Sequence, residues 1–114
     1  MNNKHIEKLI PKAIELLQKF PKEKVYQGYL ASFGPTVITS GILQAVAFYN
    51  GDDKKNEVIK LMFKLIKDDL KSDKNTLLEV LKEGDNYKNH ALKNKILEAS
   101  IACKLAIRTF ELKD

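Results

Sequence analysis

The chain has 114 residues, 31% of them charged, and carries a formal net charge of +5 from 20 Lys and Arg against 15 Asp and Glu. This length favours a single domain, residues 1–114, that can bury a core without a disulfide or a structural metal. The single cysteine excludes an internal disulfide, and the lack of an apolar leader makes a reducing cytoplasm the expected location.

The N-terminal third predicts two helices. Apolar residues at intervals of three and four predict a helix over about 4–19, kinked at Pro11. A second helix is expected over about 24–33. We expect Gly34-Pro35 to end it, because the residue before a proline disfavours the helical conformation.

The 27 residues from Val25 to Gly51 contain no charged side chain, which is unusual in so charged a chain. We expect this run to be buried, with a central apolar helix over 36–49 that begins after Pro35. Gly41 lies in its middle, where the missing side chain would let another backbone approach closely. Fourteen residues are too few for a membrane span, which needs about 20, so no membrane partner is expected. The residues expected to face inward are Val37, Ile38, Gly41, Ile42, Ala45, Val46, Phe48 and Tyr49.

A fourth helix, over about 53–71, is predicted after an acidic pair. We interpret Asp52 and Asp53 as helix caps and not as a metal site, because no third ligand is near in sequence. Asp68 and Asp69 are expected to pair with lysines one turn away. One side of the helix carries four lysines within about 60° of one another, in a ridge roughly 16 Å long. These are Lys60, Lys64, Lys67 and Lys71.

The C-terminal third predicts a short helix and a long one. A capping box over 76–79 starts the short helix, and Gly84 stops it. The last helix, over about 92–112, is the second buried element because it carries few charges. Lys104 and Arg108 lie one turn apart in it, either as a cationic pair or with Arg108 paired to a nearby carboxylate. No strand is predicted, so we expect an all-α bundle of about six helices.

Residues that carry chemistry are few and scattered. Cys103 has the apolar neighbours of a buried thiol, and His5 and His90 lack the spacing of metal ligands. We find no glycine-rich phosphate loop and no nucleophile elbow. The sequence therefore predicts a basic helical protein without catalytic residues, metal or cofactor, and its net charge is compatible with an anionic partner.

The charge-free run resembles the small helical subunit of the Cmr complex, the type III-B CRISPR RNA-guided effector. The family shows a tyrosine, then a proline, then a helix of the form Ile-x-x-x-Gly-Leu-x-x-x-Leu-Ala-Phe. Here Tyr26, Pro35, Gly41 and Phe48 stand at the corresponding places, and they look structural. The resemblance implies a compact helical domain without catalytic activity that stacks beside the repeated backbone subunits in antiviral defence.

The resemblance also implies partners, namely the other Cmr subunits, the CRISPR RNA and its target RNA, with self-association along the complex. Base pairing already determines the sequence of a guide–target duplex, so a holding protein needs phosphate contacts. The lysines of the first predicted helix form an alternative surface for these phosphate contacts. The two remaining alternatives are a type III-A small subunit and a helical adaptor without a nucleic-acid role. The candidate RNA contacts are Lys60, Lys64, Lys67, Lys71, Lys104 and Arg108.

Overall fold

The computed structural model describes residues 2–114 and confirms the prediction of an all-α fold. Within these residues the chain forms six α-helices and two short 3₁₀ helices, and the one extended pairing is a parallel bridge between Glu23 and Lys113. The elements are α1 (Asn3–Leu17), α2 (Lys24–Ser40), α3 (Ile42–Asn50), α4 (Asp53–Ile66), η1 (Lys67–Asp69), α5 (Leu77–Lys82), η2 (Glu83–Lys88) and α6 (His90–Ile107).

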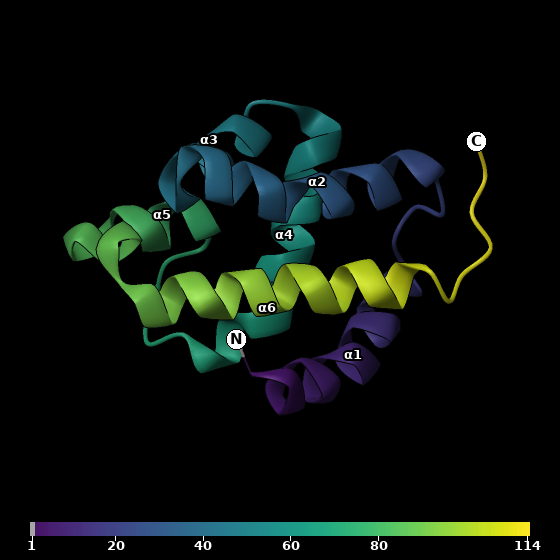
Figure 1. The fold of residues 1–114 in the computed structure, drawn as a ribbon, viewed down its shortest axis with the longest axis horizontal. Coiled ribbons are helices and arrows are strands. Elements are labelled where there is room, and N and C mark those ends of the chain that lie inside the picture. Colours follow the sequence, from purple (N-terminus) through teal and green to yellow (C-terminus); the bar gives the residue numbers. More distant parts are fainter. Residues whose placement is uncertain (1) are drawn as a thin grey trace.

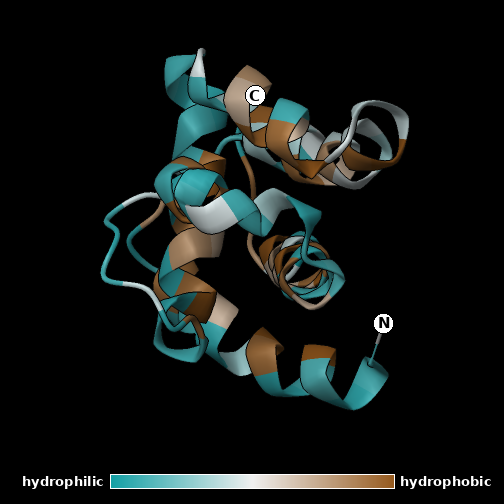
Figure 2. Ribbon diagram, turned by 90° about the vertical axis from the view of Figure 1, so that its left-hand side faces the viewer, coloured by the Kyte–Doolittle hydropathy of each residue, from teal (hydrophilic) through white to brown (hydrophobic). Residues whose placement is uncertain are grey.

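Helix α6 lies across the middle of the molecule, and the other long helices pack around it (Figure 1). α1 and α2 lie on opposite sides of it, and α4 crosses behind it at a steep angle. Figure 2 looks along α6 and shows the apolar side of α1 turned toward it. The last helix is therefore a buried element, as the sequence predicts.

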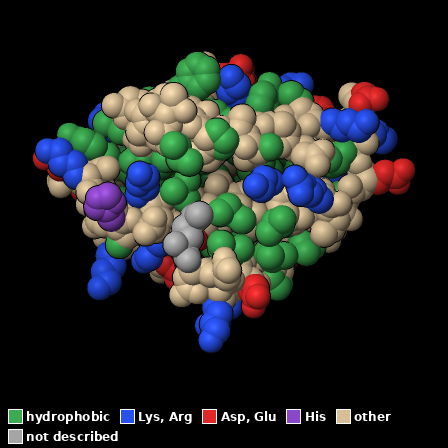
Figure 3. Space-filling view, in the orientation of Figure 1, with side chains coloured by type: hydrophobic (Ala, Val, Ile, Leu, Met, Phe, Trp, Pro, Cys, Tyr) green, Lys and Arg blue, Asp and Glu red, His purple; other side chains and the backbone are tan. Residues whose placement is uncertain are grey.

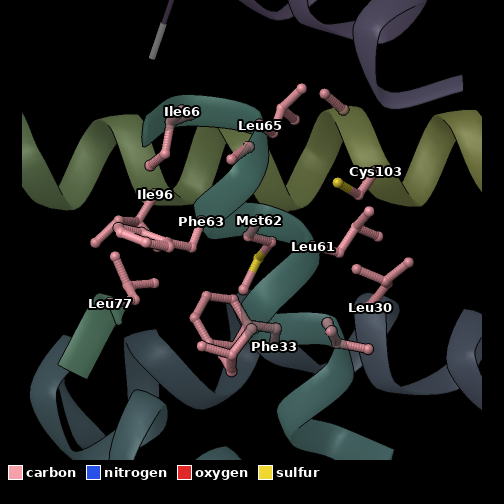
Figure 4. Packing of buried hydrophobic residues seen from close by; sticks show 14 of the residues in the cluster. Leu30, Phe33, Leu61, Met62, Phe63, Leu65, Ile66, Leu77, Ile96 and Cys103 are labelled. Carbon is pink, nitrogen blue, oxygen red and sulfur yellow. The ribbon is translucent and has the colours of Figure 1, made fainter. Parts of the chain in front are cut away.

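The hydrophobic core surrounds α4 on several sides. Seven of the 14 residues of α4 are buried, more than a single amphipathic stripe supplies. Figure 4 shows the reason: Phe63 points toward Leu77 of α5, whereas Met62 lies next to Phe33 of α2. α4 also packs against α6, so apolar neighbours enclose it on most of its circumference.

The single cysteine lies in this core, as its apolar neighbours predict. Cys103 on α6 is fully buried, and burial raises the pKa of its thiol from 9.0 to about 12. A thiol with so high a pKa stays protonated at neutral pH. Cys103 is therefore a packing residue and not a nucleophile.

Helix α2 runs through Gly34-Pro35, so the predicted helix end at this dipeptide is wrong. Pro35 is exposed, and the Thr36 hydroxyl donates to the Ser32 carbonyl at 2.8 Å. The buried side chains keep helical spacing on both sides of the proline, so core packing maintains the helix across it. These buried residues are Tyr26, Leu30, Phe33 and Val37.

The break in the charge-free run lies instead at Gly41, between α2 and α3. Gly41 has φ 94° and ψ 158°, a region that is essentially open only to glycine. The predicted central helix over 36–49 is therefore two helices. The predicted role of Gly41 is also wrong, because an added Cβ would meet the Gln44 side chain at 2.8 Å and not another backbone.

The break at Gly41 changes which apolar side chains are buried. Ile38 and Phe48, which we expected to face inward, are 81% and 61% exposed. The prediction that the whole charge-free run is sequestered is wrong for this outer face. The cause is that each of the two helices buries its own side. Ile38 lies outside the side of α2 that buries Phe33 and Val37. Phe48 lies outside the side of α3 that buries Ile42, Ala45, Val46 and Tyr49.

Two predicted helix starts are confirmed. The Asp52 carboxylate accepts hydrogen bonds from the backbone N–H groups of Lys54 and Lys55, both at 3.0 Å, as an N-cap does. At α5, the Thr76 hydroxyl oxygen accepts from the Glu79 backbone N–H at 3.2 Å. No helix of residues 2–114 is long and apolar enough to span a membrane.

The C-terminal helix ends at Ile107 and not near residue 112 as predicted. The residues after it form an extended tail beside the turn before α2. The Lys24 N–H donates to the Lys113 carbonyl, and the Lys113 N–H donates to the Lys22 carbonyl, both at 2.8 Å. Hydrogen bonds to a segment distant in sequence thus replace the last helical turn. The spacing of apolar residues cannot predict such hydrogen bonds.

Candidate nucleic-acid interface

The predicted lysine ridge on α4 is shorter than expected. Lys60 and Lys64 are exposed on the helix, but α4 ends at Ile66, so the prediction of a helix through residue 71 is wrong. The chain tightens into η1 and then extends, which lets Leu70 pack against the core. Lys71 therefore leaves the ridge. We call the remaining Lys60 and Lys64 the lysine pair.

Lys67 stays near the lysine pair but in a different setting. It caps the end of α4, is exposed, and its Nζ lies 5.8 Å from the centre of the Phe63 ring. Such a cation–aromatic contact at an exposed site is worth about 0.5–1 kcal/mol, which leaves the ammonium free to bind an anion as well.

A hollow of about 340 Å³ separates the lysine pair from the end of α1. We call it the α1–α4 hollow. It brings Lys19, from the competing set of first-helix lysines, to the same surface as the lysine pair. Glu15 and Glu57 also line it, and Glu57 pairs with Lys60 at 3.6 Å. Lys64 forms no ion pair with a residue of 2–114.

A second hollow, of about 230 Å³, lies on the other side of the lysine pair. We call it the α4–α5 hollow, and the end of α3 closes it. Its floor is apolar and its rim carries three asparagines and a threonine. Lys60 and Lys64 line both hollows, so the pair forms the wall between them. The lining residues are Asn50, Asn56, Ile59, Lys60, Phe63, Lys64, Asn75, Thr76 and Leu77.

The other predicted RNA contacts lie elsewhere on the surface. Lys71 lines a third hollow, of about 220 Å³, together with Lys95. Lys104 of α6 is half-buried, and Arg108, which caps the end of this helix, is exposed. Figure 3 shows basic side chains over the C-terminal half of α6, surrounded by apolar and uncharged atoms. Arg108 forms no ion pair with a carboxylate of residues 2–114, and neither residue lines the α4 hollows.

Several other lysines are held by contacts inside the protein. The Lys22 ammonium donates to three carbonyls at the end of α1 and lies over the Phe110 ring. Lys55 lies 4.4 Å from the centre of the Phe48 ring. Of the lysines that line the α1–α4 and α4–α5 hollows, Lys19 and Lys64 thus have neither an ion pair nor a cation–aromatic contact in residues 2–114.

The acidic residues after α4 do not pair as predicted. Asp68 lies 3.8 Å from the Lys12 ammonium of α1, and Asp69 lies 4.0 Å from His5. The expectation of lysine partners one turn away is wrong, because α4 has already ended and its side-chain spacing no longer applies.

Helix α6 contains a buried carboxylate that the sequence patterns did not indicate. Glu98 on α6 is 5% exposed and accepts hydrogen bonds from the backbone N–H of Asn2 and from His5 Nδ1, both at 2.9 Å. His5 is therefore packed against α6 and not part of a free tail. A charged residue inside an apolar helix was the available signal, since a buried carboxylate needs partners. This contact attaches the start of α1 to α6.

The described residues contain no group of three His, Cys, Asp or Glu side chains that could hold a metal ion. The fold and surface thus define a small all-α protein that presents exposed lysines beside two hollows. The family model described as CRISPR-associated protein (Cas_Cmr5) matches residues 1–108, almost the whole chain. The chain belongs to this family, which is the small subunit family of type III-B Cmr systems.

Membership confirms the resemblance and favours type III-B over the type III-A alternative. The family is a non-catalytic small subunit, and membership implies association with other Cmr subunits. No match to the chain is found among curated proteins or among solved structures. Of the family motif, Tyr26 is buried with its ring centre 4.9 Å from that of Phe20, and Gly41 joins two helices. Pro35 and Phe48 are exposed.

Proposed function

We propose that this chain contacts the phosphates of the guide RNA and target RNA in a cytoplasmic type III-B complex active in antiviral defence. The contact surface is the lysine pair with Lys19 and Lys67. The single observation that carries this proposal is the convergence of Lys19 from the α1 side with Lys60 and Lys64 at one hollow. Two separate segments thereby supply positive charge to one place.

The chemistry of lysine suits this role. An ammonium on a flexible stem binds phosphate as a point charge without selecting a base, and a duplex that is already paired needs only such contacts. Glu15 and Glu57 partly offset the charge of the hollow, and Glu57 is the partner of Lys60. Lys19 and Lys64, which have no carboxylate partner in residues 2–114, are therefore expected to contribute most.

Reversing the charge of Lys64 and Lys67 to Glu is expected to weaken target RNA binding by the assembled complex. Affinity falls as salt rises, and each lost phosphate contact makes the slope of log affinity against log salt less steep by about one. The double variant should therefore reduce the steepness by about two. Titration of labelled target RNA across 50–200 mM salt, roughly the range over which such contacts respond most, measures the slope.

The matched control reverses Lys82 and Lys88, which are exposed and line neither α4 hollow. It makes the same change in net charge, so it separates a local contact from a change in overall charge. An unchanged slope in the Lys64 and Lys67 variant, or an equal loss in the control, would remove the α4 surface from consideration.

We further propose that the exposed, uncharged surface of α2 and α3 contacts another Cmr subunit or a second copy of this chain. Ile38 and Phe48 are exposed there, and the run from Val25 to Gly51 carries no charge that would have to be desolvated. Large exposed apolar side chains on a segment that carries no charged residue of its own are typical of interfaces.

Ile38→Lys is expected to reduce incorporation of this chain into the complex at least tenfold, because it places a charge in the proposed contact. The side chain is 81% exposed, so the isolated protein should keep its stability. Pull-down with the other subunits measures incorporation. The Lys64 and Lys67 variant should incorporate normally, and incorporation of Ile38→Lys at the level of the unchanged protein would disprove the proposed contact.

A further inference from the structure

The α4–α5 hollow combines an apolar floor with a polar rim. Ile59 and Phe63 of α4 and Leu77 of α5 form the floor, and all three are buried. Figure 4 shows the Phe63 ring pointing toward Leu77 across the gap between these helices. The floor is therefore a preformed apolar surface and does not depend on a loop closing over it.

The rim supplies hydrogen-bonding groups that the fold does not use. Asn50 and Asn75 are exposed, Asn56 is half-buried, and the side-chain amides of all three lack hydrogen-bond partners within residues 2–114. Each amide offers both donors and an acceptor. Three such groups converge on one hollow, and the lysine pair stands at its edge.

The size of the hollow limits what it can hold. Pockets for drug-sized ligands measure about 300–1,000 Å³, whereas this hollow measures about 230 Å³. It therefore suits one planar heterocycle and not a peptide helix. A heterocycle with donors and acceptors along its edge matches the amides, and a phosphate attached to it would lie within reach of the lysines.

We propose that the α4–α5 hollow takes the base of one unpaired nucleotide of the bound RNA, while Lys60 and Lys64 hold its phosphate. This inference rests on the proposed function and adds a base contact to it. The amide groups can each rotate to present a donor or an acceptor, so the hollow accepts different bases. It thus favours an unstacked nucleotide over a paired one without selecting a sequence.

The first test titrates the isolated full chain with uridine 5′-monophosphate, adenosine 5′-monophosphate and ribose 5-phosphate, observed by NMR. Both nucleotides are expected to shift the side-chain amide signals of Asn56 and Asn75, whereas Asn94, exposed on α6, should not move. Ribose 5-phosphate lacks the base and is expected to bind about tenfold more weakly.

The second test replaces Asn56 by Leu, which has similar size and cannot donate or accept a hydrogen bond. Leu is also the better helix former, so α4 should remain folded. Nucleotide affinity is expected to fall about tenfold. Asn94→Leu makes the same change on α6, away from the hollow, and should leave affinity unchanged.

The outcomes separate this inference from the proposed function. Equal binding of ribose 5-phosphate and the nucleotides, or unchanged affinity in Asn56→Leu, overturns the base contact and leaves the phosphate contacts standing. A different outcome would be nucleotide binding at Asn56 together with an unchanged salt slope in the Lys64 and Lys67 variant of the complex. This outcome would keep the hollow as a nucleotide site and overturn the proposed RNA contact of α4. Shifts that involve neither Asn56 nor Asn75 disprove the site.

Discussion

Phe33→Ala is expected to lower the free energy of unfolding by about 3–5 kcal/mol, the largest effect of any change considered for this chain. Phe33 is completely buried between α2 and α4, and its ring centre lies 5.3 Å from that of Tyr49 in a T-shaped arrangement. Removing the ring loses apolar burial and leaves a cavity that neighbouring helices fill only in part. A small domain has about 5–15 kcal/mol in total, so the variant should be marginal.

Phe48→Ala is the matched control, because it removes the same atoms from an exposed position. Phe48 is 61% exposed, and the Lys55 ammonium lies 4.4 Å from the centre of its ring, so we expect a loss of at most about 1 kcal/mol. Urea denaturation followed by circular dichroism measures both variants. A loss of several kcal/mol in Phe48→Ala would contradict the exposed position and restore the sequence-based expectation of an inward-facing ring.

Gly41→Ala and Gly28→Ala are expected to change stability in opposite directions. Alanine at Gly41 must adopt φ 94° and ψ 158°, which costs roughly 1–3 kcal/mol. Gly28 lies inside α2 and is not followed by a proline, and an added Cβ there meets no atom of another segment within 4 Å. Alanine at Gly28 should therefore stabilise the helix by about 0.5–1 kcal/mol, because glycine loses more backbone entropy on folding.

Thermal unfolding distinguishes these two glycine variants directly. For a chain of this size, each kcal/mol shifts Tm by roughly 4 °C. We therefore expect Tm to fall by about 4–12 °C in Gly41→Ala and to rise by about 2–4 °C in Gly28→Ala. A rise in Tm for both variants would mean that Gly41 lies in a continuous helix, as periodicity alone predicts, and that α2 and α3 are not separate.

The two breakers in the charge-free run show why sequence patterns predicted its helices incompletely. Pro35 is the stronger helix breaker by local propensity, yet α2 continues through it because buried residues on both sides share one face. A glycine such as Gly41 costs less helix stability than a proline. The helix nevertheless ends there, because the turn between α2 and α3 needs a backbone conformation that only glycine adopts readily. Local propensity ranked these two positions in the wrong order.

In the candidate site, too, local features could be predicted from the sequence and features that depend on packing could not. The sequence predicted Lys60 and Lys64 on one side of a helix, because two residues four apart always share a face. It could not predict that Lys71 leaves this surface or that Lys19 joins it. Both depend on where α4 ends and on how the end of α1 packs against it. The amides of the α4–α5 hollow likewise come from three separate segments.

The sequence by itself determined the all-α class, the buried thiol, the helix caps at Asp52 and Thr76, and the family. These features follow from local spacing and from side chains that act on their own backbone or on a neighbour one turn away. Only the tertiary structure decided the break at Gly41, the exposure of Ile38 and Phe48, the Glu98 contact to the start of α1, and the two hollows beside the lysine pair. Each of these depends on segments far apart in the chain, whose packing energies exceed the local preferences that a sequence displays.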